Sequence, residues 1–111
     1  MSYNHKTLLG IDIVEFEENM DLYSVPEVKK FCKELLTKGS KKLLVNLEKV
    51  KFMDSSALGM LINLRHECNE RNVKLKLAAL TEECKKLFDL TKMQNNFEIH
   101  DTVNEAVRAF G

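Results

Sequence analysis

The sequence predicts an α/β sandwich in which crossover helices pack on a mainly parallel central sheet. Residues 43–47 form an almost unbroken apolar run, which is too short for a typical helix and fits a strand buried on both faces. Strand and helix patterns alternate over short connections, as they do when parallel strands are joined by helices. A length of 111 residues suits a single domain over residues 1–111.

The first half of the chain contains strand patterns followed by one helix. Apolar residues alternate over residues 9–16, which predicts one or two strands with Gly10 at a bend or bulge. Ser24 and Glu27 have the spacing of a capping box, so a helix is expected to begin there. This helix should end near Gly39, which can adopt the left-handed conformation that closes many helices.

The second half continues the alternation. We expect strands at residues 73–79 and 97–100, and helices over residues 55–69, from Thr81 and from Thr102. Thr102 and Glu105 form a second capping box. In the helix that begins at Thr81, the apolar spacing predicts that Leu90 is buried together with Cys84 and Phe88.

The composition argues against several classes of function. Lys plus Arg and Asp plus Glu each total 17, and no basic stripe of the kind that binds nucleic acid is visible, so Lys41 and Lys42 are expected on a solvated surface. No apolar run approaches the roughly 20 residues that span a bilayer, so we expect no membrane insertion. Cys32, Cys68 and Cys84 lack metal or redox spacing, which indicates reduced core residues of a cytoplasmic protein without metal or cofactor.

Three helix-capping residues, Asp54, Ser55 and Ser56, follow the central strand segment and precede a helical pattern. A helix N-terminus favours negative charge, so a phosphate on Ser55 or Ser56 would suit this position. Functional groups of open α/β sheets also gather at the carboxyl ends of strands. The same residues serve as redundant caps in proteins that have no such site, and both interpretations stay open from the residues alone.

The segment with Phe52 and Met53 before it resembles the signature loop of the STAS domains, in particular the bacterial anti-sigma factor antagonists. The residues that carry this resemblance are Asp54, Ser55, Ser56, Ala57, Leu58 and Gly59. Residues 21–27, 86–91 and 97–106 are similar to other parts of the family, so the resemblance covers most of the chain. Ala57 stands where the family usually has glycine, and its side chain is expected beside the phosphorylation site.

The resemblance implies a STAS-type sandwich, with helices covering one face of the sheet more than the other, and a regulatory function. In this family an unphosphorylated antagonist binds an anti-sigma factor and frees the sigma factor. The anti-sigma factor is also the serine kinase and binds the ATP, and a phosphoserine phosphatase reverses the modification. Position by position, the resemblance assigns phosphorylation to Ser55. We expect the surrounding surface to bind the partner, with Asp54, Ser56, Ala57, Leu58 and Gly59 as the candidate contacts. Asp54 also fits a helix cap, and Ser56 also fits a structural capping role.

Two other functions have to be distinguished from this one. A STAS domain can act without a phosphorylation cycle, as a fixed subunit of a stress-signalling scaffold or of a lipid or anion transporter. A serine hydrolase is disfavoured, because the segment lacks the glycines of a nucleophile elbow and His66 lies three helical turns beyond Ser55. The sequence therefore predicts a protein that is not an enzyme, and a hydroxyl group that a partner kinase modifies.

Overall fold

The computed structural model describes residues 3–111, and within that range it contains a five-stranded sheet and a two-stranded sheet. In chain order the elements are β1 (Tyr3–Leu8), β2 (Ile11–Phe16), β3 (Asn19–Met20), α1 (Val25–Thr37), β4 (Lys42–Asn46), β5 (Phe52–Met53), α2 (Ser55–Glu70), β6 (Lys74–Ala78), α3 (Glu82–Thr91), the 3-10 turn η1 (Met93–Asn96), β7 (Ile99–His100) and α4 (Val103–Ala109). No helix in the described range is long and apolar enough to cross a bilayer.

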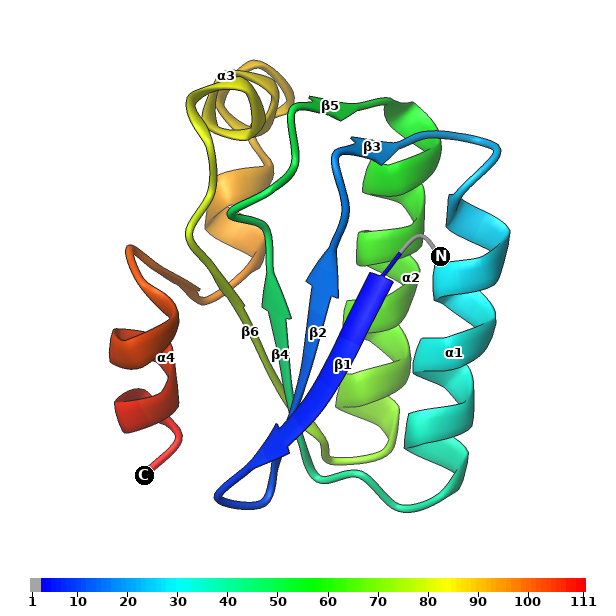
Figure 1. Cartoon of the computed structure of the whole chain (residues 1–111), viewed down its shortest axis with the longest axis vertical. Coiled ribbons are helices and arrows are strands. Elements are labelled where there is room, and N and C mark those ends of the chain that lie inside the picture. The colour runs from blue at the N-terminus through cyan, green and yellow to red at the C-terminus, as the bar shows by residue number, and fades with distance from the viewer. Residues whose placement is uncertain (1–2) are drawn as a thin grey trace.

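The main sheet has the strand order β1-β2-β4-β6-β7 (Figure 1). β1 pairs with β2 in antiparallel fashion, and the remaining neighbours pair in parallel. The predicted mainly parallel sheet is therefore confirmed. β4 lies at its centre, and Leu43, Leu44 and Val45 are fully buried, as expected for a strand covered on both faces.

Helices cover the two faces of the sheet unequally (Figure 1). α1 and α2 pack side by side on one face and α3 lies near β5, whereas α4 alone lies on the other face. The larger core, between the sheet and α1, α2 and α3, includes Val14, Phe16, Val45, Leu61 and Phe88. A smaller core under α4 is formed by Ile11, Ile13, Leu44, Ala78, Ala106 and Phe110. This asymmetry is the one that the resemblance implies.

The three cysteines lie in the core, as predicted. Cys32, Cys68 and Cys84 are buried with free thiols. Burial raises the pKa of the Cys32 thiol to about 12 and that of Cys68 to about 11. These thiols therefore stay protonated at neutral pH and act as small apolar core residues.

Helix ends follow the predicted chemistry at two positions. Gly39 has a φ of 100°. Its N–H donates a hydrogen bond to the Leu36 carbonyl, and the N–H of Ser40 donates one to the Leu35 carbonyl, both at 3.1 Å. These two bonds form a Schellman motif that closes α1. At the start of α4, the Thr102 hydroxyl accepts a hydrogen bond from the Glu105 N–H at 3.1 Å, as the capping box predicts.

The start of α1 differs from its predicted capping box. Ser24 occupies the N-cap position, but its side chain makes no capping hydrogen bond. Its hydroxyl instead accepts from the Asp21 N–H at 3.0 Å and donates to the Asn19 carbonyl at 2.9 Å. The Asp21 carboxylate accepts from the N–H groups of Tyr23 and Ser24. The prediction is wrong because Asp21 takes the local N–H groups and draws the serine hydroxyl away from the helix.

Two apolar residues that belong to periodic patterns in the sequence are exposed, and one of them, Leu90, was predicted to be buried. Leu90 is 82% exposed, because at 3.6 residues per turn it lies about 240° around α3 from Cys84, off the buried stripe. Leu9 is 78% exposed in the turn between β1 and β2, so the alternation of β2 starts at Ile11 instead. Leu9 and Gly10 have φ values of 53° and 77°, and positive φ at both central residues is what a type I′ hairpin turn requires.

Candidate functional site

Two short strands hold the start of α2 at the carboxyl end of the main sheet (Figure 1). β3 and β5 pair in parallel, Asn19 with Phe52 and Met20 with Met53. The pairing continues into Asp54, whose backbone N–H donates to the Met20 carbonyl oxygen at 3.1 Å. Because Met20 and Met53 are buried in the core, this small sheet fixes the position at which α2 begins.

Asp54 is the N-cap residue of α2 and has an extended backbone. Its Oδ1 atom accepts hydrogen bonds from the backbone N–H groups of Ser56 at 2.9 Å and Ala57 at 3.2 Å. Its Oδ2 atom accepts from the N–H of Leu22 at 3.1 Å, in the connection between β3 and α1. One carboxylate thus caps the helix and also joins it to a loop 32 positions earlier in the chain.

Ser55 is the first residue of α2, and its side chain is exposed. Its hydroxyl has no hydrogen-bond partner within residues 3–111, and the hydroxyl of the half-buried Ser56 has none there either. Asp54 therefore caps the helix, and the Ser55 oxygen is accessible to another protein. Since Asp54 already occupies the N–H groups of Ser56 and Ala57, a phosphate on Ser55 would meet fewer free N–H groups than the capping pattern suggests.

The other residues assigned to partner binding divide into a buried and an exposed group. Ala57 is fully buried and Leu58 is 7% exposed, and both belong to the larger core. The methyl group of Ala57 fills core space, so it does not contribute to the exposed surface around Ser55. Gly59 is exposed one turn after Ser55, and a Cβ atom there would meet nothing within 4 Å.

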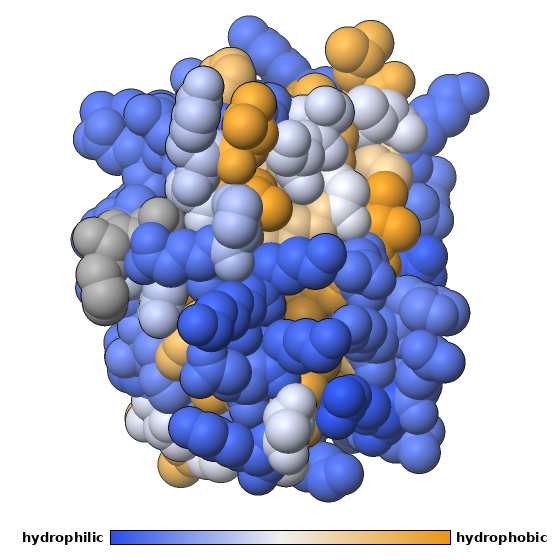
Figure 2. All heavy atoms as spheres, turned by 90° about the vertical axis from the view of Figure 1, so that its right-hand side faces the viewer, coloured by the Kyte–Doolittle hydropathy of each residue, from blue (hydrophilic) through white to orange (hydrophobic). Residues whose placement is uncertain are grey.

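Exposed apolar side chains flank this end of α2. Leu22 and Tyr23, in the loop held by Asp54, are 57% and 85% exposed, and Phe52 in β5 is 53% exposed. Figure 2 shows apolar and weakly polar side chains gathered at the top of the face that carries α1, above a largely hydrophilic surface. We call the area formed by Leu22, Tyr23, Phe52, Ser55 and Gly59 the Ser55 surface. Its apolar content is typical of a surface that binds another protein.

The sequence of the chain matches a known protein family. The STAS domain family model matches residues 3–106, which is nearly the whole chain. The chain belongs to the STAS domain family. The resemblance of residues 54–59 to this family is thereby confirmed.

Several proteins similar to this STAS domain are named anti-sigma factor antagonists. An anti-sigma-B factor antagonist of Staphylococcus epidermidis is 26% identical over 103 residues, which cover 91% of this chain and 95% of the relative. Among solved structures, a candidate anti-sigma factor antagonist of Thermotoga maritima has a TM-score of 0.90 at 23% identity, covering 96% of this chain and 92% of that one. The phosphorylated form of the Bacillus cell fate determinant SpoIIAA has a TM-score of 0.79 at 16% identity, covering 98% and 99%. These structures confirm the STAS-type sandwich.

No histidine among residues 3–111 is hydrogen-bonded to the Ser55 hydroxyl. His66 lies further along α2, where its Nε2 atom is 3.3 Å from a carboxylate oxygen of Glu70. No group of three or more His, Cys, Asp or Glu side chains in the described part of the chain is arranged to hold a metal ion. The arrangement at Ser55 suits a hydroxyl group that another protein modifies, because an unassisted serine is a weak nucleophile.

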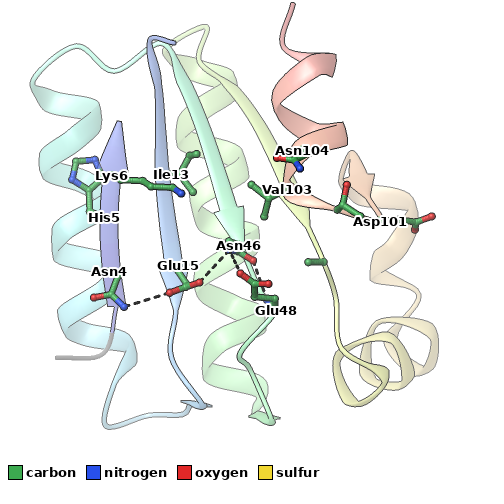
Figure 3. Close-up of a pocket in the computed structure, with 12 residues that line it drawn as sticks. Asn4, His5, Lys6, Ile13, Glu15, Asn46, Glu48, Asp101, Val103 and Asn104 are labelled. Carbon is green, nitrogen blue, oxygen red and sulfur yellow. Dashed lines mark hydrogen bonds between the residues drawn. The ribbon is translucent and has the colours of Figure 1, made fainter. Parts of the chain in front are cut away.

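A separate cavity of about 600 Å³ lies on the sheet face that carries α4 (Figure 3). Its lining comes from several segments, Asn4, His5, Lys6, Ile13, Glu15, Asn46, Glu48, Ala79, Asp101, Thr102, Val103 and Asn104. The sequence did not indicate this cavity, because its polar residues are scattered along the chain and meet only after folding. It shares no residue with the Ser55 surface.

Three polar residues of this cavity, Asn46, Glu15 and Glu48, form one hydrogen-bonded network. Asn46 is 5% exposed; its Nδ2 atom donates to Glu15 at 3.3 Å and to Glu48 at 2.9 Å, and its Oδ1 accepts from the Glu48 N–H at 3.0 Å. Burial raises the pKa of Glu15, but hydrogen bonds from Lys49 and Asn4 lower it by more, so the pKa lies below its ordinary value. The network joins the ends of β2 and β4, and its groups are already paired.

Proposed function

We propose that this protein is a phosphorylation-controlled anti-sigma factor antagonist in which Ser55 is the switch. The unmodified protein binds an anti-sigma factor and frees the sigma factor. The anti-sigma factor is also a serine kinase that brings its own ATP, and phosphorylation of Ser55 ends the binding. A phosphoserine phosphatase then restores the unmodified form.

The exposed hydroxyl of Ser55, set among exposed apolar side chains, is the observation that carries this proposal. A kinase substrate needs an accessible oxygen, and a docking surface needs apolar area that water does not favour. Asp54, Ser56 and Gly59 reach this surface and would contact the partner directly. Ala57 and Leu58 are buried, so they would support binding by holding α2 in place.

Phosphorylation would oppose docking by charge. A phosphate adds roughly −1.5 to −2 charges beside the Asp54 carboxylate. If a partner carboxylate lies about 5 Å away, the repulsion is on the order of several kcal/mol at an effective dielectric constant of about 20. Each 1.4 kcal/mol of binding free energy corresponds to about a tenfold change in the dissociation constant, so affinity would fall by a factor of hundreds or more. The fold should persist, because Ser55 is exposed at a helix N-terminus that favours negative charge.

The matched variants Ser55→Ala and Ser56→Ala test this proposal. Neither hydroxyl has a partner within the described range, so each substitution should change the free energy of unfolding by less than about 0.5 kcal/mol. After incubation with ATP and a lysate of the source cells, mass spectrometry should find phosphate on the wild type and on Ser56→Ala. Ser55→Ala should remain unmodified.

Phosphate on Ser56, or uptake of phosphate by Ser55→Ala, would contradict the assignment of the site. A purified anti-sigma factor that bound the phosphorylated and unmodified proteins equally would contradict the switch. That second result would favour a STAS subunit without a phosphorylation cycle.

A further inference from the structure

The tip of the β1–β2 hairpin departs from two local preferences at once. Leu9 has a φ of 53° and is 78% exposed, and its neighbour Leu8 is 43% exposed. Bulky side chains avoid positive φ, and two-residue hairpin turns favour asparagine followed by glycine at these positions. Two adjacent leucines also gain nothing from contact with water. Residues held in disfavoured conformations cluster at functional sites.

Basic residues lie at the same end of the molecule as this tip (Figure 1). The α1–β4 and α2–β6 connections and the strand starts that follow them carry Lys38, Lys41, Lys42, Arg71 and Lys74. None of them forms an ion pair with any residue in the range 3–111. We call these five residues, together with Leu8 and Leu9, the hairpin end. Its five basic residues outnumber the acidic Asp12 and Glu70 at the same end, although the formal net charge of the chain is zero.

Hydrogen bonds hold the leucines beside the basic residues. The Asp12 carboxylate accepts from the Ser40 hydroxyl at 2.6 Å and from the Thr7 hydroxyl at 3.3 Å, and so joins the hairpin to the α1–β4 connection. The Lys74 N–H donates to the Lys41 carbonyl at 3.0 Å, which joins the two basic connections. The apolar tip and the basic residues therefore form one fixed surface.

We propose that the hairpin end docks on an anionic phospholipid surface. Leu8 and Leu9 enter the headgroup region, and the basic side chains meet the lipid phosphates. Peripheral binding of this kind strengthens with the apolar area buried and with attraction to anionic lipids. The contact is superficial, since no helix within residues 3–111 could span a bilayer.

Shape and chemistry favour a lipid surface over other anionic partners. The tip is convex, and a Cβ atom added at Gly10 would meet nothing within 4 Å. A fluid lipid layer receives a convex apolar tip without a matching pocket, whereas a protein partner would need an apolar hollow with an acidic rim. A nucleic acid would engage the lysines alone and would leave the conformation and exposure of Leu9 unexplained.

Sedimentation with vesicles tests the proposal. The full chain should sediment with vesicles of phosphatidylcholine mixed with phosphatidylglycerol, and not with vesicles of phosphatidylcholine alone. Raising the ionic strength from about 0.1 M to about 1 M, which shortens the Debye length from about 10 Å to about 3 Å, should release it. Leu9→Asn should lower the partition coefficient about tenfold, because it removes a leucine side chain from the contact. Lys41→Gln with Lys42→Gln should lower it by about as much or more.

The controls separate docking from folding. Asparagine is favoured at positive φ, so Leu9→Asn should melt at or above the temperature of the wild type while binding vesicles less. Leu90→Gln removes an equally exposed leucine from α3, and Lys85→Gln with Lys86→Gln removes two exposed lysines there. α3 lies at the opposite end of the molecule (Figure 1), so these variants should bind as the wild type does.

Three results would overturn the proposal. They are failure of the wild type to bind anionic vesicles, equal binding to neutral vesicles, and binding that Leu9→Asn leaves unchanged. Capture of duplex DNA or of an acidic protein that survives Leu9→Asn would count against lipid as the occupant in the same way. Phosphorylation of Ser55 should be the same in Leu9→Asn and in the wild type, so either proposal can fail without the other.

Discussion

At the scale of single residues, Gly59 and Leu9 occupy exposed positions where the backbone favours a different residue. Gly59 lies within α2 at a site where a Cβ would have open space, so an alanine would fit and would favour the helix. Leu9 has a positive φ that asparagine or glycine adopts more readily. Neither residue improves folding. Such disagreements between local preference and the residue present are expected where a surface serves binding.

Replacing Gly59 by alanine should separate stability from binding. Gly59→Ala should raise the free energy of unfolding by about 0.5–1 kcal/mol, because glycine in a helix interior costs about that much relative to alanine. The added methyl group lies on the Ser55 surface and would keep a partner backbone at a greater distance, so affinity for the anti-sigma factor should fall. Urea unfolding and calorimetric titration measure the two effects.

A matched control for this variant is Asn69→Ala, at an exposed position near the far end of α2. It should keep or raise stability, because alanine is the better helix former. Its affinity for the partner should equal that of the wild type. If Gly59→Ala were more stable and bound the partner as well as the wild type does, Gly59 would not belong to the binding surface.

At the scale of elements, α2, the β3–β5 pair and the β3–α1 connection act as one unit because Asp54 bonds to all three. Its backbone N–H extends the β3–β5 pairing, its Oδ1 atom caps α2, and its Oδ2 atom holds Leu22. The exposed Leu22 and Tyr23 are thereby kept next to Ser55. The Ser55 surface is therefore assembled from separate segments by one carboxylate.

Two substitutions at Asp54 should divide these roles. Asparagine caps helices about as well as aspartate does, but an amide nitrogen cannot accept the Leu22 N–H. In Asp54→Asn, backbone hydrogen exchange measured by NMR should accelerate at Leu22 and stay slow at Ser56 and Ala57. Asp54→Ala should accelerate exchange at all three and cost about 1 kcal/mol of stability. An unchanged exchange rate at Leu22 in Asp54→Asn would show that the carboxylate does not hold the loop.

Patterns carried by long elements could be predicted from the sequence, and contacts between short distant segments could not. The apolar run of β4, the helical spacing of α2 and the glycine that closes α1 each contain their own signal. β3 and β5 are two residues long, too short for any alternation to show. The bond between Asp54 and Leu22 joins positions 32 apart. The serine and its helix were therefore predictable, whereas the loop that completes the surface depends on the fold.

At the scale of the whole molecule, the parallel strands direct their carboxyl ends, and Ser55 with them, away from the hairpin tip (Figure 1). The molecule extends 31 × 27 × 24 Å. Acidic residues outnumber basic ones in the loops near Ser55. The basic residues there are Lys49 and Lys51, and the acidic ones are Glu17, Glu18, Asp21, Glu48 and Asp54. The sequence predicted that Lys41 and Lys42 lie on a solvated surface. It did not predict that they lie close to Arg71 and Lys74, because only the fold brings the α1–β4 and α2–β6 connections to the same end of the molecule.

Acid should destabilise the fold through carboxylates whose pKa values lie below ordinary. Burial raises the pKa of Asp12, but hydrogen bonds, of which that from Ser40 is the strongest, lower it by more. The same holds for Glu15, where the hydrogen bond from Lys49 is the strongest. The hydrogen bond from Lys76 lowers the pKa of Glu98. Such groups add stability above their unfolded pKa values, and the gain is lost as pH falls through the folded values. The urea midpoint should therefore decrease as pH falls below the ordinary values of 4.5 for Glu and 3.8 for Asp.

Asp12→Asn provides the control for this pH dependence. It removes one of the titrating groups, so its midpoint should be lower than that of the wild type at neutral pH and should decrease less on acidification. A midpoint that rose as the pH fell would contradict the assignment of lowered pKa values to these carboxyl groups.

The separation of acidic and basic residues along the molecule has a consequence for how it orients. With a sequence isoelectric point of about 6.8, the chain should migrate little in a uniform electric field near neutral pH, yet its two oppositely charged poles would feel a torque. Near a negatively charged wall it would turn its basic pole inward before touching, over a range set by the ionic strength. Ser55 would then face the bulk solution, from which the proposed kinase would reach it by diffusion.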